Sequence, residues 1–504
     1  GAWVGFTCIA DTIDTTAIVD IDPARIIINE PTDFELPPGG LNIRLHDTPL
    51  IQEARMIDWK LDAARAFARA NRLDKVVFGH AAPRLGLVTI GKSYLDVRQA
   101  LDELEISEEM AREWGLGIYK VAMAWPLEPQ GMRAFAQTTE ELLVVEEKRS
   151  VLESQIKEQL FHWDRRPRVL GKTDHTGKPL FTEKAELNPV DIARVLAGRI
   201  LSFGPNDYVS ERLARMEHRV RQNTPSSTTV RTPFFCSGCP HNTSTRLPDG
   251  SRGLAGIGCH YMVTWMGRNT EVFSQMGGEG VQWIGQSPFS GDDHVFANLG
   301  DGTYFHSGLL AVRAAVSAKV NMTYKILYND AVAMTGGQPV DGTLSVYDIA
   351  QQLDAEGVKR IVVVSDGPEK YGLGRGLPHG TKIFHRDELD QVQRDLRQEK
   401  GVTIIIYEQT CAAEKRRRRK RNKYPDPARR VVINELVCEG CGDCSAKSSC
   451  LSVVPVETEF GRKRQIDQSS CNKDFSCLKG FCPSFVTVEG GSLKKPKPAA
   501  AKGD

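Results

Sequence analysis

Seven of the twelve cysteines in this chain lie near its C-terminal end, at spacings that suit iron–sulfur chemistry. They are Cys438, Cys441, Cys444, Cys450, Cys471, Cys477 and Cys482. The first three are each separated by two residues, so their thiolates can bind neighbouring irons of one cubane cluster while a distant cysteine completes the ligand set. Thiolates are soft ligands of the kind that such clusters use. The spacing therefore predicts a site that carries electrons.

The seven cysteines divide into two sets if they follow two-cluster ferredoxins, in which the fourth cysteine of each run binds the other run's cluster. On that pattern, one 4Fe-4S cluster is bound by Cys438, Cys441, Cys444 and Cys482. A second is bound by Cys450, Cys471 and Cys477, with Asp474 where a middle cysteine is missing. Carboxylate is a harder ligand than thiolate, so iron on Asp474 should be more labile. We expect one cluster, and a second if Asp474 serves as its ligand.

Other uses of these thiols stay open. Zinc or disulfide bonds are the alternatives, although tetrahedral zinc sites typically use two C-x-x-C pairs and not three cysteines in a row. The spacings to Cys450 and Cys482 are longer than in bacterial ferredoxins, and Leu451 stands where a proline is usual.

A second group of residues, further upstream, has the layout of a thiamine diphosphate motif. Gly300-Asp301-Gly302 follows one expected strand, and Asn329 follows the next strand after 26 intervening residues. Because ligands of parallel sheets bind outside the carboxyl ends of the strands, we expect Asp301 and Asn329 at one site. Their oxygens suit Mg²⁺, and the backbone carbonyl of Ala331 is placed to join them.

The glycines of this motif suit a phosphate ligand. Gly300 and Gly302 let backbone N–H groups approach phosphate oxygens, and the N-terminus of the following helix favours negative charge. Gly-Asp-Gly alone is common in ordinary turns. The spacing to Asn329 is what points to a diphosphate and its magnesium.

A third group contains two cysteine-bearing turns and is expected to line the diphosphate and thiazolium. Its members are Cys236, Gly238, Cys239, His241, Gly258 and Cys259. Zinc binding and buried structural cysteines are the alternatives, although the adjacent Cys259 and His260 can hardly both bind one ion. The loop Ser274 to Gly280 is either another cofactor-facing segment or a plain flexible loop.

Three histidines near these motifs are candidate proton carriers, namely His241, His260 and His306. A place in the core or on the surface is the commoner role for a histidine. His306 is the one that we expect to be catalytic, because it follows the phosphate turn.

Two α/β blocks must position these residues. Expected strands lie at 85–90, 117–121, 142–147, 295–299, 324–328, 361–364 and 403–407. Expected helices lie at 93–104, 129–138, 190–201 and 307–318. Strands that alternate with helices of such length predict parallel sheets covered on both faces. The basic run Lys415 to Arg421 is expected to be a solvated linker, which could steer an acidic partner, rather than a nucleic-acid site.

The overall composition is that of an ordinary globular protein. With 40% apolar residues, 26% charged residues and a net charge of +1, the chain has no general attraction for nucleic acid or membrane. No apolar run approaches the roughly 18 residues of a membrane span. Thiols grouped at metal-binding spacing, in a chain of 504 residues, indicate a reducing cytoplasm.

Together the motifs resemble the indolepyruvate:ferredoxin oxidoreductases, a family of 2-oxoacid:ferredoxin oxidoreductases, and most of all their long fused bacterial form. The resemblance rests on the stretches 236–241, 256–259, 300–308 and 329–338. It extends to 125–129 and 145–148, which are similar to the family's transketolase C-terminal-like domain, and to the cysteine-rich tail.

The resemblance implies an α/β fold with two parallel-sheet domains followed by a small ferredoxin-like domain. The expected segments are 1–45 (the end of a pyrimidine-binding-like domain and a linker), 46–165 (transketolase C-terminal-like), 166–230 (a connector), 231–412 (thiamine diphosphate-binding), 413–429 (a basic linker), 430–490 (ferredoxin-like) and 491–504 (a disordered tail). Only the last strands of the pyrimidine-binding-like domain could lie in residues 1–30, which contain apolar runs at 17–19 and 26–28.

The resemblance also implies a reaction. It is the oxidative decarboxylation of a 2-oxo acid, such as the aryl pyruvate indolepyruvate, with coenzyme A to acyl-CoA and CO₂, while electrons pass through iron–sulfur clusters to ferredoxin. The family's cofactors are thiamine diphosphate, Mg²⁺ and 4Fe-4S clusters. The family's activating glutamate, and its smaller catalytic-type domain or subunit, have no counterpart that we can identify in this sequence. We therefore expect the downstream part of a longer polypeptide or subunit, incomplete alone, whose full-length chain forms a homodimer.

Two rival functions remain. A non-oxidative thiamine-dependent decarboxylase or carboligase would leave the cysteine-rich domain without a role. An electron-transfer subunit with a vestigial thiamine site would contain clusters but no thiamine.

Overall fold

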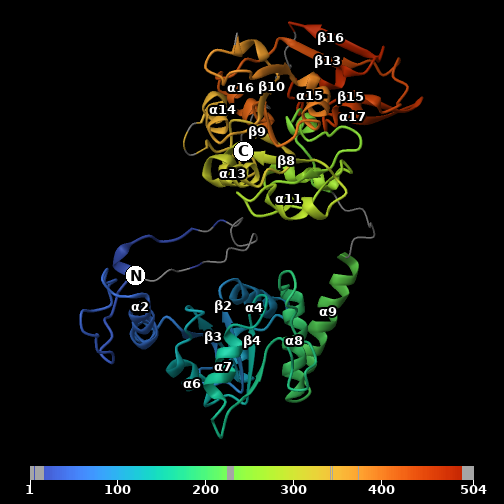
Figure 1. Cartoon of the computed structure of the whole chain (residues 1–504). Coiled ribbons are helices and arrows are strands. Elements are labelled where there is room, and N and C mark those ends of the chain that lie inside the picture. The colour runs from blue at the N-terminus through green and yellow to red at the C-terminus, as the bar shows by residue number, and fades with distance from the viewer. Residues whose placement is uncertain are drawn as a thin grey trace. The chain divides into compact units, whose positions relative to one another are not determined.

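The computed structural model describes residues 5, 16, 18–223, 232–340, 342, 344–372 and 374–490. The chain divides into two compact units, Gly1–Thr228 and Thr229–Asp504 (Figure 1). Each unit has its own hydrophobic core. The expected disordered tail at 491–504 lies outside the described residues.

The first unit contains a five-stranded sheet in the order β1-β3-β2-β4-β5. Its strands are β1 (Lys75–Gly79), β2 (Leu85–Ile90), β3 (Leu116–Val121), β4 (Glu141–Val145) and β5 (Arg168–Leu170). Neighbouring strands are parallel except that β1 runs antiparallel to β3. All residues of β4 are buried, as expected for a strand that is covered on both faces. The predicted α/β class is confirmed.

Helices precede and cover this sheet. They are η1 (Pro23–Arg25), α2 (Pro49–Arg55), the π-helical η2 (Met56–Lys60), α3 (Leu61–Ala70), α4 (Lys92–Glu103), α5 (Glu108–Glu113), α6 (Pro129–Ala136), α7 (Leu152–Leu160), α8 (Pro189–Ser202) and α9 (Asp207–Asn223). Helix α8 begins with Pro189 in its first turn and is capped by Asn188, whose side chain accepts a hydrogen bond from the Val190 N–H. Both residues favour a helix start at this point.

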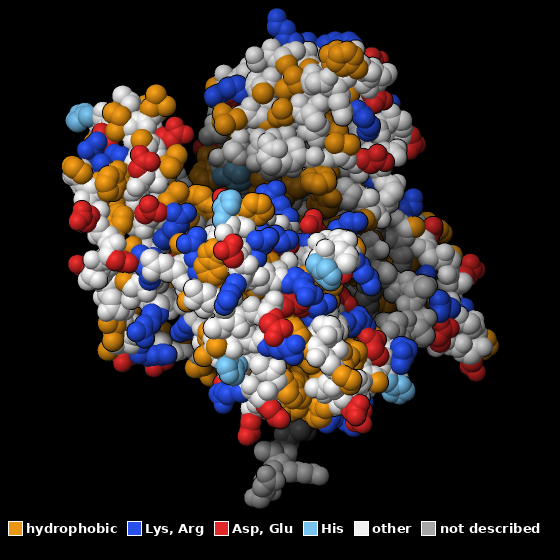
Figure 2. Space-filling model, turned by 90° about the horizontal axis from the view of Figure 1, so that it is seen from below, with side chains coloured by type: hydrophobic (Ala, Val, Ile, Leu, Met, Phe, Trp, Pro, Cys, Tyr) orange, Lys and Arg blue, Asp and Glu red, His pale blue; other side chains and the backbone are white. Residues whose placement is uncertain are grey.

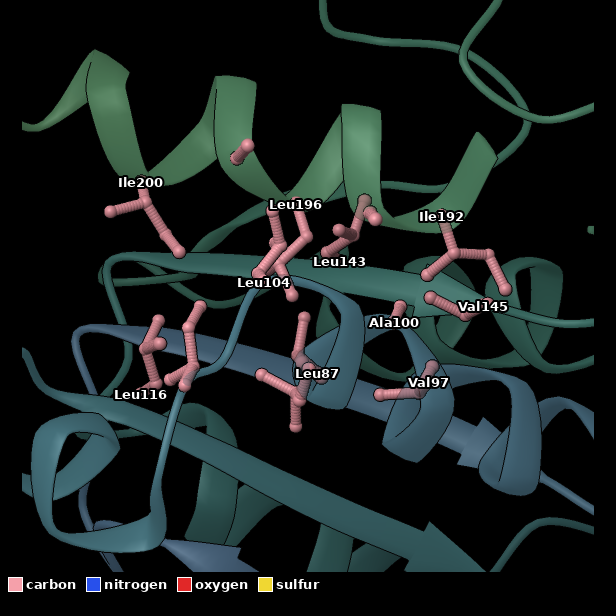
Figure 3. Close-up of a cluster of buried hydrophobic side chains, with 14 of the residues drawn as sticks. Leu87, Val97, Ala100, Leu104, Leu116, Leu143, Val145, Ile192, Leu196 and Ile200 are labelled. Carbon is pink, nitrogen blue, oxygen red and sulfur yellow. The ribbon is translucent and has the colours of Figure 1, made fainter. Parts of the chain in front are cut away.

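Helix α8 supplies part of the core of the first unit. Ile192, Leu196 and Ile200 recur at helical spacing on one face and point toward Leu143 and Val145 of β4 (Figure 3). All five side chains are buried. Burial of an aliphatic side chain of this size contributes about 1.5–3 kcal/mol.

The stretch 166–223 differs from the connector that we expected for 166–230. Leu170 of β5 pairs with Leu143 of β4, so the stretch adds a strand to the first sheet. Helix α8 packs on the same sheet. A strand of three residues is too short to show an apolar pattern in the sequence, which explains why it was missed.

The isoleucines near the N-terminus form no strand within the described residues. Ile26, Ile27 and Ile28 are 74%, 76% and 67% exposed and follow η1 in irregular chain. A strand needs a neighbour for its N–H and C=O groups, and this segment has none within the described part of the chain. Residues 26–28 therefore form no strand within the described residues, and Ala17 of the other apolar run lies outside them.

The second unit is built on a seven-stranded sheet in the order β11-β10-β12-β9-β8-β6-β7. Its strands are β6 (Gly253–Leu254), β7 (Thr270–Glu271), β8 (Val295–Gly300), β9 (Met322–Tyr328), β10 (Arg360–Ser365), β11 (Lys382–His385) and β12 (Val402–Glu408). All neighbours are parallel. The carboxyl ends of β8 and β9 therefore meet at the same edge, where Gly300 stands opposite Leu327.

Short and long helices connect these strands. They are α10 (His241–Ser244), η3 (Cys259–Trp265), α11 (Val281–Gln286), η4 (Ser287–Phe289), α12 (Asp301–Thr303), the π-helical η5 (Tyr304–Gly308), α13 (Leu309–Ala318), α14 (Val346–Ala355), η6 (Pro368–Tyr371), η7 (Arg386–Glu388), α15 (Leu389–Leu396) and α16 (Ala412–Lys420). Strand β8 continues through α12 and η5 into α13, which leads back to β9. This second parallel α/β domain confirms the prediction.

The cysteine-rich end of the chain forms a small domain within the second unit. Its elements are β13 (Arg429–Ile433), α17 (Asp443–Ser448), β14 (Val453–Thr458), β15 (Gly461–Ile466), η8 (Ser476–Lys479) and β16 (Phe485–Glu489). β13 pairs with β16 and β14 with β15, both antiparallel. Five cysteines pack with Ile433, Val453 and Ile466 in its core. The ferredoxin-like name stays a prediction.

The basic run that we expected to be a solvated linker is helix α16. Arg417 donates to the carbonyl of Gly337 at 2.8 Å, and Arg419 donates to the carbonyl of Asn472 at 2.8 Å. The helix therefore contacts both the loop after β9 and the cysteine-rich domain. Its arginines serve contacts within the unit, which a charge count of the sequence does not reveal.

Charges are mixed on the molecular surface. On the face in Figure 2, Lys and Arg side chains lie interspersed with Asp and Glu. Among the residues that the structure describes, no helix has the length and apolar character needed to cross a membrane.

Candidate functional site

Asp301 and Asn329 meet at the carboxyl ends of β8 and β9. The Oδ2 atom of Asp301 accepts hydrogen bonds from the backbone N–H groups of Asn329 (3.0 Å) and Asp330 (2.9 Å). Its Oδ1 atom accepts one from the N–H of Gly302 (2.9 Å). Asp301 and Asn329 are each 7% exposed. Adjacent parallel strands thus bring together two residues that are far apart in the sequence.

The oxygen atoms at this edge fit a hard divalent cation. The Oδ1 atom of Asn329 is buried and has no hydrogen-bond partner within the described residues. Burial raises the pKa of Asp301 to about 6, and a bound cation would favour its charged form. Ala331, whose carbonyl we expected to join them, is also buried. Nevertheless, no group of three or more His, Cys, Asp or Glu that could hold a metal ion is found among the described residues.

A cavity of about 360 Å³ opens beside Asp301. Its lining includes Tyr328, Asp330 and Gln338 from the end of β9 and the following loop, and Arg418 from α16. Small-molecule sites typically occupy about 300–1,000 Å³, so the cavity has a suitable size. Arg418 forms a salt bridge of 2.5 Å with Asp330, so α16 helps to hold the loop that lines the cavity.

The loop before η3 lies close to the end of β8. A Cβ atom at Gly256 would lie 2.2 Å from the backbone oxygen of Asn298, so only glycine fits there. Gly258 has a φ of +149°, and its Cβ would lie 2.7 Å from the ring of His260. A Cβ at Gly300 would lie 3.3 Å from the same ring. The expected cofactor-facing glycines therefore surround a buried histidine beside Asp301.

The three candidate histidines have different environments. The rings of His241 and His260 are both buried and lie 5.6 Å apart, edge to face. Burial lowers the pKa of His241 to about 3 and that of His260 to about 4, so both are neutral at neutral pH. His306 in η5 is exposed, and its Nδ1 atom lies 2.5 Å from the hydroxyl of Ser307. Of the three, His306 is the one open to solvent.

The loop Ser274–Gly280 contributes a buried acid that our interpretation of the sequence did not single out. Glu279 is 0% exposed, and its Oε2 atom accepts a hydrogen bond from the N–H of Gly277 (2.7 Å). Its Oε1 atom has no partner within the described residues. Burial raises the pKa of Glu279, whereas the nearby His306 lowers it. The loop therefore places a carboxyl group close to the candidate catalytic histidine.

Cys411, which was missed from the sequence, lies near Cys236, Cys239 and Cys259, although no three of these thiols are arranged to hold a metal ion in the described part of the chain. Burial raises the pKa of Cys239 well above its usual value, and the nearby thiols of Cys236, Cys411 and Cys259 raise it further. Burial raises the pKa of Cys259 to about 11, again with Cys411 and Cys236 nearby. Cys411 follows β12, and its backbone N–H donates to the carbonyl of Asn329 at 2.9 Å. Its place just after a central strand was the signal that could have revealed it.

The members of the first expected cluster set lie before α17 (Cys438 and Cys441), within it (Cys444) and after η8 (Cys482). The Cys438 sulfur accepts a hydrogen bond from the N–H of Gly440 at 3.4 Å. Burial raises the pKa of Cys444, and the nearby Cys438 adds to this effect. Cys441 is exposed, and the Cys482 sulfur lies 2.9 Å from the hydroxyl of Ser484. Cys438 therefore lies near Cys444.

The second expected set comes together in the core of the same domain. Burial raises the pKa of Cys477 to about 12, with the nearby Cys450 and Cys471 adding to it. The three thiols line a small cavity. The Cys471 sulfur accepts a hydrogen bond from the N–H of Lys473 at 3.5 Å. Asp474 borders the same cavity, but its carboxylate forms a salt bridge of 2.5 Å with Arg386.

Two family models match this chain. Residues 75–223 match the "Indolepyruvate oxidoreductase domain", which includes the whole five-stranded sheet of the first unit. Residues 256–406 match the "Thiamine pyrophosphate enzyme, C-terminal TPP binding domain", which includes Asp301 and Asn329. The domain that carries the proposed diphosphate site is therefore similar to domains that bind thiamine diphosphate.

Curated relatives resemble the chain over most of its length. It is 24% identical over 436 residues to indolepyruvate oxidoreductase subunit IorA of Thermococcus kodakarensis, covering 80% of this chain and 60% of the relative. It is 23% identical over 496 residues to the subunit of that name from Pyrococcus abyssi, covering 92% and 69%. The chain thus spans 60% and 69% of the length of these relatives. These matches confirm the resemblance that the motifs indicated.

Among solved structures, a 2-oxoglutarate:ferredoxin oxidoreductase from Magnetococcus marinus matches 37% of this chain and 66% of its own. The two are 18% identical, with a TM-score of 0.28.

Proposed function

We propose that this chain, which is a relative of the indolepyruvate oxidoreductases, takes part in the thiamine-dependent oxidation of a 2-oxo acid. The complete reaction that we propose is the oxidative decarboxylation of an aryl pyruvate such as indolepyruvate. Coenzyme A takes the acyl group, CO₂ leaves, and electrons pass through iron–sulfur clusters to ferredoxin. Any further domains or subunits that the longer relatives contain would be needed for that complete reaction.

Thiamine diphosphate, when bound, supplies the carbanion chemistry by which a 2-oxo acid loses CO₂. In this chain, Asp301 and Asn329 would bind Mg²⁺ through side-chain oxygens, joined by the backbone carbonyl of Ala331. The N–H groups of the turn Gly300–Gly302 would approach the phosphate oxygens. The unpartnered Oδ1 atom of Asn329 supports this assignment, because a buried acceptor without a partner is costly.

The remaining residues of the site orient ligands, exclude water and move protons. His306 is proposed to exchange a proton at its Nε2 atom, since its Nδ1 atom is held by the hydroxyl of Ser307. The buried rings of His241 and His260 stay neutral and form a wall behind the diphosphate end. A dry wall of this kind strengthens the electrostatic interactions of the site.

Three sets of thiols are proposed to bind iron–sulfur clusters. Two belong to the cysteine-rich domain, and the third consists of Cys236, Cys239, Cys259 and Cys411 beside the proposed thiamine site. Four neighbouring thiolates repel one another, and binding to one cationic cluster would offset that repulsion. This supports a role as cluster ligands rather than as four separate structural cysteines. Clusters would provide the outlet for electrons that a simple decarboxylase lacks.

The observation that carries the proposal is the bond between Asp301 and Asn329 at the edge of a domain that matches thiamine-binding domains. The test is to purify the chain without oxygen and to measure its iron and acid-labile sulfide content. Binding of thiamine diphosphate with Mg²⁺ is then measured by calorimetry. We expect iron and sulfide in equal amounts and magnesium-dependent binding of the cofactor.

The same measurements separate the alternatives. Clusters without thiamine binding would favour an electron-transfer subunit, and thiamine binding without iron would favour a non-oxidative decarboxylase. Absence of both would refute the proposal.

A further inference from the structure

Asp474 stands at the position where the second cysteine run lacks its middle cysteine, yet both of its carboxylate oxygens are already in use. Oδ1 accepts hydrogen bonds from Arg386 Nη1 (2.5 Å) and from Gln409 Nε2 (3.0 Å). Oδ2 accepts one from the hydroxyl of Ser476. Arg386 also donates to the backbone carbonyl of Asp474 at 2.9 Å, so its guanidinium group binds both the side chain and the backbone of Asp474.

The partners of Asp474 come from a different part of the unit. Arg386 lies in η7, and Gln409 follows β12, so both belong to the α/β domain that matches thiamine-binding domains. The Arg386 and Asp474 side chains are only 11% and 15% exposed. Removing one partner of a buried ion pair leaves an uncompensated charge, so a change at either residue should weaken the contact between the two domains.

The whole turn around Asp474 is seated on the same α/β domain. Asn472 Nδ2 donates to the carbonyl of Ser237 at 3.0 Å, and Arg419 of α16 donates to the carbonyl of Asn472 at 2.8 Å. A Cβ atom at Gly238 would lie 2.9 Å from the Cβ of Asp474. The second cysteine run of the small domain therefore packs directly on the turn that carries Cys236 and Cys239.

We propose that Asp474 is a docking residue, which fixes the second cysteine run against the thiamine-binding domain, and that it does not bind iron. This differs from the ligand role expected from the sequence, because the buried guanidinium of Arg386 already compensates the charge of the Asp474 carboxylate, and Gln409 and Ser476 bind the same two oxygens. Where clusters are concerned, the inference rests on the proposed function. The second site then keeps three protein thiolates, from Cys450, Cys471 and Cys477.

Docking at this point has a consequence for electron transfer. Cys471 and Cys477 flank Asp474 in the sequence, and the turn of Cys236 and Cys239 lies on the other side of the contact. The Asp474–Arg386 pair thus sets the distance between the proposed cluster of Cys450, Cys471 and Cys477 and the proposed cluster of Cys236, Cys239, Cys259 and Cys411. Asp474 is a positioning residue in this role, since it acts through the placement of the thiolates.

The test compares Asp474→Asn and Arg386→Met in the full chain, purified without oxygen. Arg394→Met is the matched control, because Arg394 lies nearby on α15 but pairs with Asp390 of its own helix at the surface. Arg386→Lys is a further variant, which keeps the positive charge but has fewer N–H donors for Asp474. Three quantities are measured: iron and sulfide per chain, the EPR spectrum of the reduced protein, and hydrogen exchange of the segment 469–478.

If Asp474 is a docking residue, both variants keep the iron content and the EPR spectrum of the original chain. Exchange of 469–478 accelerates about tenfold or more in both, since each loses a charge-assisted hydrogen bond, while the control does not change. Arg386→Lys should restore part of the protection.

Two results would overturn the proposal. One is a lost or altered cluster signal in Asp474→Asn that Arg386→Met does not share, because a ligand role predicts that difference. The other is unchanged exchange in both variants. Hydrogen exchange needs no iron, so a chain that proves to hold no cluster refutes the cluster part of the proposed function while the docking contact is still tested.

Discussion

The carboxylate of Asp301 accepts the backbone N–H of Asn329 at 3.0 Å, which ties the end of β8 to the loop after β9. The side-chain Oδ1 atom of Asn329 is buried and has no hydrogen-bond partner among the described residues. One residue thus shapes the loop, and the other offers an unused acceptor. This arrangement is compatible with the proposed magnesium and diphosphate site, in which both side chains would bind the cation.

Replacement of Asp301 by asparagine should weaken the binding of thiamine diphosphate with magnesium. An amide carries no charge to attract the cation, and the loss of a well-placed polar group at a metal site typically costs about 10–100-fold in affinity. Calorimetric titration at fixed Mg²⁺ concentration measures the change. Asp293→Asn is the control, because Asp293 is exposed in the loop before β8. Equal affinities for both variants would contradict the assignment.

Replacement of Cys411 by serine should lower the iron content of the chain by up to one cluster. Cys411 lies near Cys236, Cys239 and Cys259, and a hydroxyl group is a much poorer ligand for iron than a thiolate. Iron and sulfide assays after anaerobic purification measure the loss. Cys8→Ser is the control, since Cys8 was assigned to none of the three thiol sets. If the iron content of Cys411→Ser stays unchanged, the four thiols are structural.

Replacement of Gly238 by alanine should destabilise the second unit more than replacement of Gly250. The two glycines have similar left-handed conformations, with φ of +67° and +72°. At Gly250 nothing lies within 4 Å of the added Cβ, whereas at Gly238 it would lie 2.9 Å from the Cβ of Asp474. Both variants are destabilised because alanine is strained in the left-handed conformation. The free energy of unfolding of Gly238→Ala should fall by about 1–3 kcal/mol more, because its Cβ overpacks the contact with Asp474. Urea unfolding of both variants measures the difference, and equal losses would show that the turn is not packed against Asp474.

The central strands of both sheets could be predicted from the sequence because they are apolar runs between turn signals, whereas the short or outer strands β1, β5, β6, β7 and β11 were missed. The same rule placed Asp301 and Asn329 at one edge, since residues that follow neighbouring parallel strands must lie together. Each prediction used local sequence and a general property of parallel sheets. Neither needed a specific long-range contact.

The elements that were missed depend on long-range contacts. Helix α16 was taken for a solvated linker because the carbonyl groups that bind Arg417 and Arg419 are far away in the sequence. Cys411 has no cysteine at metal-binding spacing, and its neighbours become apparent only when β12 is placed beside β9. Asp474 looked like a ligand because its spacing matches a cysteine, whereas its partner Arg386 is 88 positions away.

Replacement of Lys325 by methionine should change how the stability of the second unit depends on pH. Lys325 lies in β9 with 0% exposure, and its Nζ atom donates to Gln393 Oε1 (3.0 Å) and to the carbonyl of Arg246 (3.2 Å). Burial lowers its pKa from 10.5 to about 7, and the nearby Arg268 adds to this effect. Between these two values, the unfolded chain binds a proton that the folded chain does not. The free energy of unfolding contributed by Lys325 therefore rises with pH in that window, by at most about 1.4 kcal/mol per pH unit, and is flat below it.

The methionine variant lacks this group, so its free energy of unfolding should rise less steeply with pH than that of the original chain. Urea unfolding at several pH values between about 7 and 10 measures both slopes, and the titration of other groups cancels in their difference. Lys359→Met is the control, because Lys359 is exposed to solvent just before β10. Parallel curves for Lys325→Met and the original chain would show that Lys325 keeps its charge in the folded state. In that case Gln393, the carbonyl of Arg246 and the ring of Phe296 would stabilise a full buried charge against the repulsion of Arg268.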